Sequence, residues 1–134
     1  MIVADTNLIS YLLIEGEQTE AARAVWGADP DWRMPPLWRA EFLMVLVLST
    51  RAGVLDRDSA LLAWRRATAL FGACEIDPEG ERVLAVALRD GLSAYDAQFV
   101  ALAEDLGVYV VTADKGILRA RPDLARAMGE FAPS

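Results

Sequence analysis

Four acidic residues lie inside or beside apolar stretches of the sequence, where a folded domain seldom places a charge. They are Asp5, Glu41, Asp96 and Asp114, in the segments MIVAD, WRAEFLMVLVL, YDAQFVALA and VYVVTAD. Removing a carboxylate from water costs several kcal/mol unless something neutralises its charge. Four such residues in one short chain therefore predict a shared cation.

The residue types restrict which cation this is. The chain has no histidine and a single cysteine, Cys74, which excludes a His-ligated zinc site and a His-based catalytic triad. Oxygen ligands alone suit Mg²⁺ or Mn²⁺. Two such ions, about 4 Å apart, can activate a water molecule and stabilise the leaving oxygen during attack on phosphorus. The chemistry that these residues favour is metal-dependent hydrolysis at a phosphate.

Three of the four residues also have a simpler explanation. Asp5 and Asp114 each precede a predicted helix, where Asp is a preferred N-cap. Ser93-x-x-Asp96 matches a capping box, with Asp in place of the usual Glu. Helix capping therefore stays open for each of these three residues taken alone.

Glu41 has no helix end to cap. It lies inside a predicted helix, and its neighbours at helical spacing are apolar, so its side chain shares the buried face. The ordinary alternative for such a residue is a buried ion pair, here with Arg39 or Arg65.

Three polar residues flank the acidic ones in the sequence. Thr6 and Asn7 follow Asp5, and Thr112 precedes Asp114 by two positions. Their side chains could orient ligands or water around a cation. Helix capping is the alternative role for them.

The elements that must position these residues alternate between strand and helix. Strands are predicted at Ile2–Ala4, Trp32–Met34, Ala73–Ile76 and Val108–Thr112, with a final edge strand near Phe131. Helices are predicted at Asp5–Ile14, Glu17–Trp26, Pro36–Ala52, Arg57–Phe71, Glu79–Asp90, Ser93–Leu106, Lys115–Ala120 and Pro122–Met128. This alternation predicts an α/β fold, a single domain over residues 1–134, with a parallel sheet covered by helices on both faces.

Such a sheet would bring distant residues together. Asp5 follows the first strand, and Asp114 follows the strand that begins at Val108. Ligands of parallel sheets gather at the carboxyl ends of the strands. We therefore expect these two carboxylates at the same edge of the sheet.

Composition sets further limits. With 134 residues, of which 54% are hydrophobic, the chain can form one folded domain. Its longest strongly apolar run, Phe42–Leu48, is too short to span a bilayer, and we expect a soluble, cytoplasmic protein. The net charge of −7 is unusual for a nucleic-acid binder, but bound cations would offset part of it.

Two surface groups are candidates for contacts with other molecules. Phosphate contacts could come from arginines, with surface ion pairing as the alternative: Arg57, Arg65, Arg66, Arg119 and Arg121. A partner helix or a second subunit could dock on a patch of leucines: Leu12, Leu13, Leu43, Leu61 and Leu62.

Four segments, in this order and spacing, resemble the PIN-domain ribonucleases, specifically the VapC-type toxins of toxin–antitoxin pairs. The segments are MIVADTNLIS, WRAEFLMVLVL, LSAYDAQFVALAEDLG and VYVVTADKGIL, and the resemblance extends over nearly the whole chain. It implies a five-stranded parallel sheet flanked by helices and a Mg²⁺- or Mn²⁺-dependent endoribonuclease. The acidic quartet of the family would correspond to Asp5, Glu41, Asp96 and Asp114, and its hydroxyl residue to Thr112.

The same resemblance implies an RNA substrate, an antitoxin protein that blocks the cleft, and a homodimer. One position departs from the pattern, since Met44 stands where members of the family often carry Asn. A catalytically silent PIN scaffold is therefore one alternative. A Mg²⁺-binding phosphoacceptor receiver domain is another, with Asp77 as acceptor and Lys115 as its partner, although the first strand lacks the acidic pair of that class.

Overall fold

The computed structural model describes residues 1–133, within which four strands form one parallel sheet in the order β2-β1-β3-β4. The strands are β1 (Ile2–Ala4), β2 (Trp32–Arg33), β3 (Val110–Val111) and β4 (Ala125–Arg126). Val3 of the central strand pairs with Arg33 on one side and Val110 on the other. Every residue of β1 is buried, as expected for a parallel strand covered on both faces. The predicted α/β class is confirmed.

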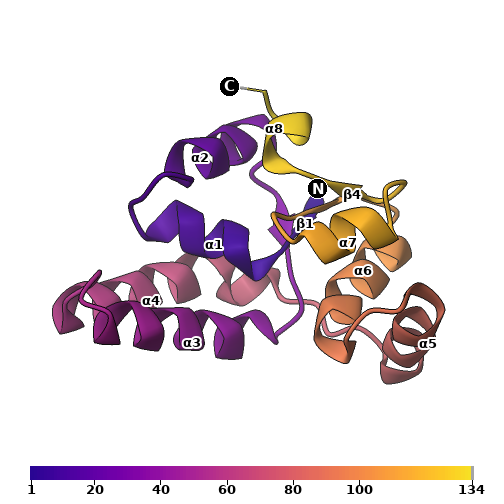
Figure 1. Ribbon diagram of the computed structural model, residues 1–134, viewed down its shortest axis with the longest axis horizontal. Coiled ribbons are helices and arrows are strands. Elements are labelled where there is room, and N and C mark those ends of the chain that lie inside the picture. The colour runs from indigo at the N-terminus through magenta and orange to yellow at the C-terminus, as the bar shows by residue number, and fades with distance from the viewer. Residues whose placement is uncertain (134) are drawn as a thin grey trace.

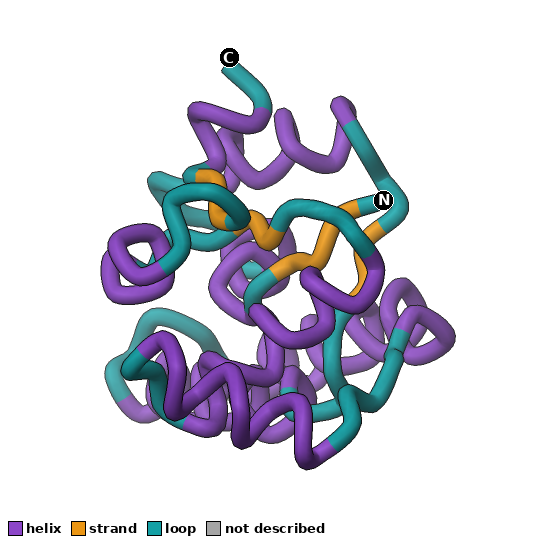
Figure 2. Tube along the Cα trace, turned by 90° about the vertical axis from the view of Figure 1, so that its right-hand side faces the viewer, coloured by secondary structure: helices purple, strands orange, loops and turns teal. Residues whose placement is uncertain are grey.

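The helices surround this small sheet (Figures 1 and 2). They are α1 (Thr6–Leu13), α2 (Thr19–Ala28), α3 (Trp38–Arg51), α4 (Arg57–Phe71), α5 (Gly80–Asp90), α6 (Ala94–Leu106), α7 (Lys115–Ala120) and α8 (Met128–Phe131). In Figure 1, α3 and α4 lie side by side below α1, while α5, α6 and α7 gather on the opposite side of the molecule. Among residues 1–133, no helix combines the length and the apolar character that crossing a membrane requires.

An aromatic cluster joins the α3–α4 pair to the sheet. Trp32 of β2 stacks on Phe71 of α4, with ring centroids 5.6 Å apart. Trp38 and Phe42 of α3 are also fully buried, and the Trp38 ring lies edge-on to Phe71 at 6.2 Å. Burial of side chains of this size stabilises a fold by about 2–3 kcal/mol each. The cluster therefore fixes the start of α3, which carries Glu41.

The predicted strand Ala73–Ile76 is wrong. Gly72–Cys74 forms a single 3₁₀ turn that continues directly from α4, and only Glu75 makes an isolated parallel bridge, with Met34. Gly and Ala have little preference for strands. The sheet therefore has four strands within the described residues, in place of the five expected.

The predicted C-terminal elements are also wrong. The segment expected as a helix, Pro122–Met128, contains strand β4, and the segment expected as an edge strand near Phe131 is helix α8. The amide of Val110 donates to the carbonyl of Leu124 at 3.2 Å, and that of Thr112 to Arg126 at 3.0 Å. Pairing with β3 outweighs the helical preference of Ala and Arg here.

Candidate active site

The four acidic residues singled out in the sequence line one cleft of about 500 Å³. Asp5 lies at the end of β1, Glu41 on α3, Asp96 in the first turn of α6, and Asp114 at the start of α7. The remaining lining residues are Thr6, Asn7, Ser10, Tyr11, Met44 and Val45. Segments more than 100 positions apart in the sequence thus meet at the carboxyl edge of the sheet, as the topology predicted.

Asp5 is the most deeply placed of the four, with 7% of its surface exposed. Its Oδ2 accepts a hydrogen bond from the Thr112 hydroxyl at 2.6 Å, and its Oδ1 accepts one from the Thr6 amide at 2.7 Å. Burial raises the pKa of Asp5 to about 6, although the hydrogen bonds from Thr112 and Thr6 oppose the shift. The charges of Glu41 and Asp96 raise it further.

Glu41 is half-buried, and Thr6 donates hydrogen bonds both to it and to Asp5. The Thr6 hydroxyl donates to Glu41 Oε1 at 2.7 Å, so Thr6 contacts both carboxylates, one through its side chain and one through its amide. Burial raises the pKa of Glu41, and the charge of Asp96 adds to the effect. The alternative of an ion pair with Arg39 is wrong, because Arg39 donates to Glu75 at 2.6 and 3.0 Å.

Asp96 and Asp114 stand at the beginnings of α6 and α7. Ser93 caps α6 by accepting from the Asp96 amide at 3.1 Å, which leaves the Asp96 carboxylate at the cleft. Burial raises the pKa of Asp96, and the charge of Asp114 raises it further. The two carboxylates therefore repel each other.

Asp114 combines capping with its place in the cleft. Its Oδ1 accepts from the amides of Gly116 and Ile117 at 2.7 and 3.0 Å, and its own amide donates to the Thr112 hydroxyl at 2.9 Å. A Cβ at position 116 would lie 3.0 Å from that carboxylate oxygen, so glycine suits the turn. The Thr112 hydroxyl thus connects Asp114 to Asp5.

The polar residues beside the quartet do not act as simple helix caps. Thr112 is fully buried and donates to Asp5. Asn7 places Nδ2 3.4 Å from Asp5 Oδ2 and accepts from the Ala113 amide at the same distance. These contacts join the end of β1 to the end of β3, and Thr6, Asn7 and Thr112 each form hydrogen bonds with residues of the acidic quartet.

The donor set fits a divalent cation. Within residues 1–133, the lining of the cleft contains four carboxylates and neither Lys nor Arg, and three of the carboxylates have a raised pKa partly through mutual repulsion. Over the same residues, no three acidic side chains already surround a single point. Asp5 and Asp114 accept hydrogen bonds from Thr112, Thr6 and the α7 amides, and carboxylate oxygens have further lone pairs for a cation.

Three lining residues, Ser10, Tyr11 and Val45, were not identified from the sequence as part of the site. Ser10 and Tyr11 follow Asn7 by three and four positions, on the same face of α1, so helical spacing from Asn7 could have indicated them. Met44, which stands where Asn is frequent in the family that the chain resembles, lies in the cleft with 57% of its surface exposed.

Comparisons with known proteins place the fold and the family of this chain. Ribonuclease VapC3 from Pyrobaculum aerophilum is 28% identical over 126 residues, which cover 92% of this chain and 96% of that protein. The crystal structure of PAE2754 from the same organism has a TM-score of 0.74 at 24% identity, over 95% of this chain and 90% of that one. The crystal structure of FitAcB from Neisseria gonorrhoeae has a TM-score of 0.67 at 21% identity, over 93% and 96%.

These two structures share the fold of this protein. The family model of the PIN domain matches residues 2–122, which include each of the four acidic residues and three of the four strands, β1, β2 and β3. The chain therefore belongs to the PIN domain family.

Proposed function

We propose that the protein is a Mg²⁺- or Mn²⁺-dependent endoribonuclease that hydrolyses phosphodiester bonds in RNA, and that it is the toxin of a type II toxin–antitoxin pair. The observation that carries the proposal is the cleft in which Asp5, Glu41, Asp96 and Asp114 meet without a basic side chain among the described residues of its lining. Membership of the PIN domain family and the similarity to a ribonuclease VapC support it.

The four carboxylates would hold the cation. When bound, Mg²⁺ or Mn²⁺ supplies the positive charge that activates water and stabilises a leaving oxygen at phosphorus. Without a cation, an acidic cleft repels the phosphate backbone of RNA. In this proposal the carboxylates bind the ion and, through it, make the cleft accessible to a polyanion.

The hydroxyl residues set the orientation of these ligands. Thr112 donates to Asp5 and accepts from the Asp114 amide, and Thr6 contacts both Asp5 and Glu41. Such supporting hydrogen bonds restrict the rotamers of ligands and maintain their charge state. Thr6, Asn7 and Thr112 are therefore assigned to positioning.

The toxin assignment includes partners. An antitoxin protein and a second copy of this chain each require an apolar surface, and a groove of about 330 Å³ between α3 and α4 offers one. Leu43 and Leu61 of the predicted leucine patch line this groove together with Trp64, whereas Leu12 and Leu13 pack against the core. We include an antitoxin, a homodimer and a cytoplasmic location in the proposal.

The proposal is tested with purified protein and end-labelled RNA. We expect cleavage with Mg²⁺ or Mn²⁺ and none in excess EDTA. Asp5→Asn and Glu41→Gln should lower the cleavage rate by at least about 100-fold, since even outer partners of metal ligands are worth about 10- to 100-fold. Glu20→Gln on the exposed face of α2 is the matched control and should cleave like the wild type. Undiminished cleavage in EDTA would contradict the metal mechanism.

A catalytically silent scaffold is the second candidate, because Met44 places an apolar side chain in the cleft. Expression of the wild type and Asp5→Asn chains in a bacterium distinguishes the two. A nuclease toxin arrests growth only as the wild type, whereas a silent scaffold affects growth equally in both forms. The receiver-domain alternative lacks support, because it required Asp77 to follow the end of a strand. The residues before Asp77 form only an isolated bridge, at Glu75.

A further inference from the structure

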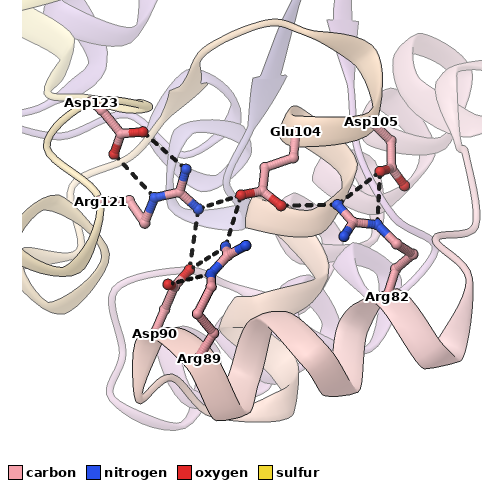
Figure 3. A network of polar contacts seen from close by, with 7 residues as sticks. All are labelled: Arg82, Arg89, Asp90, Glu104, Asp105, Arg121 and Asp123. Atoms are coloured by element: carbon pink, nitrogen blue, oxygen red, sulfur yellow. Dashed lines mark hydrogen bonds and ion pairs between the residues drawn. The ribbon is translucent and has the colours of Figure 1, made fainter.

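A network of ion pairs lies away from the cleft, where α5, α6 and the end of α7 meet (Figure 3). Its centre is Glu104, which accepts hydrogen bonds from three arginines. Arg82 donates to Oε1 at 2.9 Å, while Arg89, at 2.7 Å, and Arg121 donate to Oε2. Arg121 also pairs with Asp123 at 2.9 Å. For Arg121, the ion-pairing alternative to phosphate contact is therefore the one observed.

Only the centre of this network is shielded from solvent, since the outer side chains of Arg82, Arg89, Asp105 and Asp123 are 39–67% exposed. The exposed fraction of the side chain is 17% for Glu104, 16% for Arg121 and 8% for Asp90, which accepts from Arg121 at 3.2 Å. Exposed ion pairs contribute little to stability. In a shielded network, by contrast, loss of one member leaves the others without compensation.

The network joins two helices that both begin at the cleft. Asp96 is in the first turn of α6 and Glu104 in its last turn. Asp114 is the N-cap of α7 and Arg121 its C-cap. At 1.5 Å per residue, Asp96 and Glu104 are about 12 Å apart along their helix, and Asp114 and Arg121 are about 10 Å apart. On both helices, the residue at the cleft and the residue in the network are therefore separated by a similar length of helix.

The two ends of this pair of helices carry opposite interactions. At the cleft, Asp96 and Asp114 are like charges that line the same cavity and therefore repel each other. At the far end, Glu104 and Arg121 attract each other. A helix of six residues such as α7 is not stable by itself, and Ile117 is its one buried residue. The pair at the far end links the C-cap of α7 to the last turn of α6.

We propose that Glu104 and Arg121 are positioning residues for the cation site, because they hold α6 and α7 together at one end and thereby keep Asp96 and Asp114 within reach of one ion at the other. The inference rests on the proposed function. Neither residue lines the cleft, so both act only through the helices that carry the ligands.

The test separates positioning from ordinary stabilisation. Glu104→Gln keeps the shape of the side chain and removes the charge that three arginines share, and Glu20→Gln makes the same change on the exposed face of α2. Both are compared with the wild type by calorimetric titration with Mn²⁺ and by RNA cleavage over a range of Mn²⁺ concentrations. Circular dichroism establishes a temperature at which all chains are folded.

We expect the apparent dissociation constant for Mn²⁺ to rise by about 3- to 10-fold in Glu104→Gln, less than for a direct partner of a metal ligand. Cleavage at saturating Mn²⁺ should return to within about twofold of the wild type, because the ion itself draws the two carboxylates together. Glu104→Asp, which restores the charge, should lie closer to the wild type than Glu104→Gln. Glu20→Gln should match the wild type in both measurements.

Arg121→Lys extends the test if Glu104→Gln does not fold. It keeps the charge and loses the planar fork that contacts three carboxylates, and it should raise the apparent constant by about two- to threefold. Wild-type Mn²⁺ affinity in the folded Glu104 or Arg121 variant would refute the positioning role and leave the proposed nuclease intact. Absence of Mn²⁺ binding by the wild type would overturn both.

Discussion

Substitution of Asp5 by Asn should make the metal-free protein more stable at alkaline pH. Asp5 is 7% exposed, and its pKa is raised from 3.8 to about 6 chiefly by burial. Asn has the same shape as Asp and carries no charge. The Thr112 hydroxyl donates to Asp5 in the wild type, and in the variant the Asn amide group can instead donate to that hydroxyl. The substitution therefore removes a buried charge with little change in packing.

The size and sign of the effect follow from this shift. A pKa raised by about two units corresponds to about 3 kcal/mol of destabilisation by the charged form. Because the pKa of Asp5 is raised in the folded state, its ionised carboxyl group destabilises the fold by this full amount above about pH 6. The destabilisation disappears as the pH falls below 3.8, where the group is protonated in both the folded and the unfolded state. Because Asn replaces one acceptor oxygen with a donor, we expect a net gain of about 1–2 kcal/mol at pH 8.

Thermal and urea denaturation in EDTA measure this gain. For a chain of this length, 1–2 kcal/mol raises Tm by about 4–8 °C. The advantage of Asp5→Asn over the wild type should shrink between pH 7 and pH 4, because the wild-type carboxyl group becomes protonated. Added Mn²⁺ should stabilise the wild type more than the variant. If Asp5→Asn lowers Tm at pH 8, or if the difference in Tm between variant and wild type does not change with pH, the buried charge of Asp5 does not destabilise this fold.

Three further substitutions probe other contacts. Thr112→Val removes the hydroxyl that donates to Asp5. It should cost about 2 kcal/mol in urea denaturation and lower cleavage about 10-fold, and unchanged values in both assays would exclude the assigned role. Glu75→Gln weakens the charge-assisted bonds from Arg39, whose side chain is 40% exposed. It should lower the free energy of unfolding, measured by urea denaturation, by only about 0.5–1 kcal/mol. A loss well above this would mean that the pair is effectively buried. Met44→Asn adds a polar group to the cleft. It should raise the cleavage rate at low Mn²⁺ about two- to fivefold and change the free energy of unfolding by less than about 0.5 kcal/mol. Unchanged metal dependence would show that Met44 does not limit the site.

The acidic cleft could be located from the sequence because its ligands stand in apolar surroundings. Asp5 and Asp114 follow strands that were predicted from runs of apolar and β-branched residues, and parallel topology then places both at one edge. Glu41 was identified by the apolar face that it shares. The helices that carry these residues follow from caps and periodicity, which are local properties of the chain.

The remaining parts of the fold depend on contacts that have no local signature. Strand β4 consists of Ala125 and Arg126, which prefer helices, and its conformation is set by pairing with β3. A two-residue strand has no period to detect. The partners of Glu75 and Glu104 could not be predicted either, because the arginines that they bind lie up to 36 positions away.

The most direct test of the shared cation is X-ray diffraction from crystals soaked in Mn²⁺, with data collected to show the anomalous signal of manganese. An anomalous peak in the cleft between the carboxylates of Asp5, Glu41, Asp96 and Asp114 is the predicted result. A cleft without manganese at a saturating concentration of the ion, with these side chains still bonded to Thr6, Thr112 and the α7 amides as here, would contradict it.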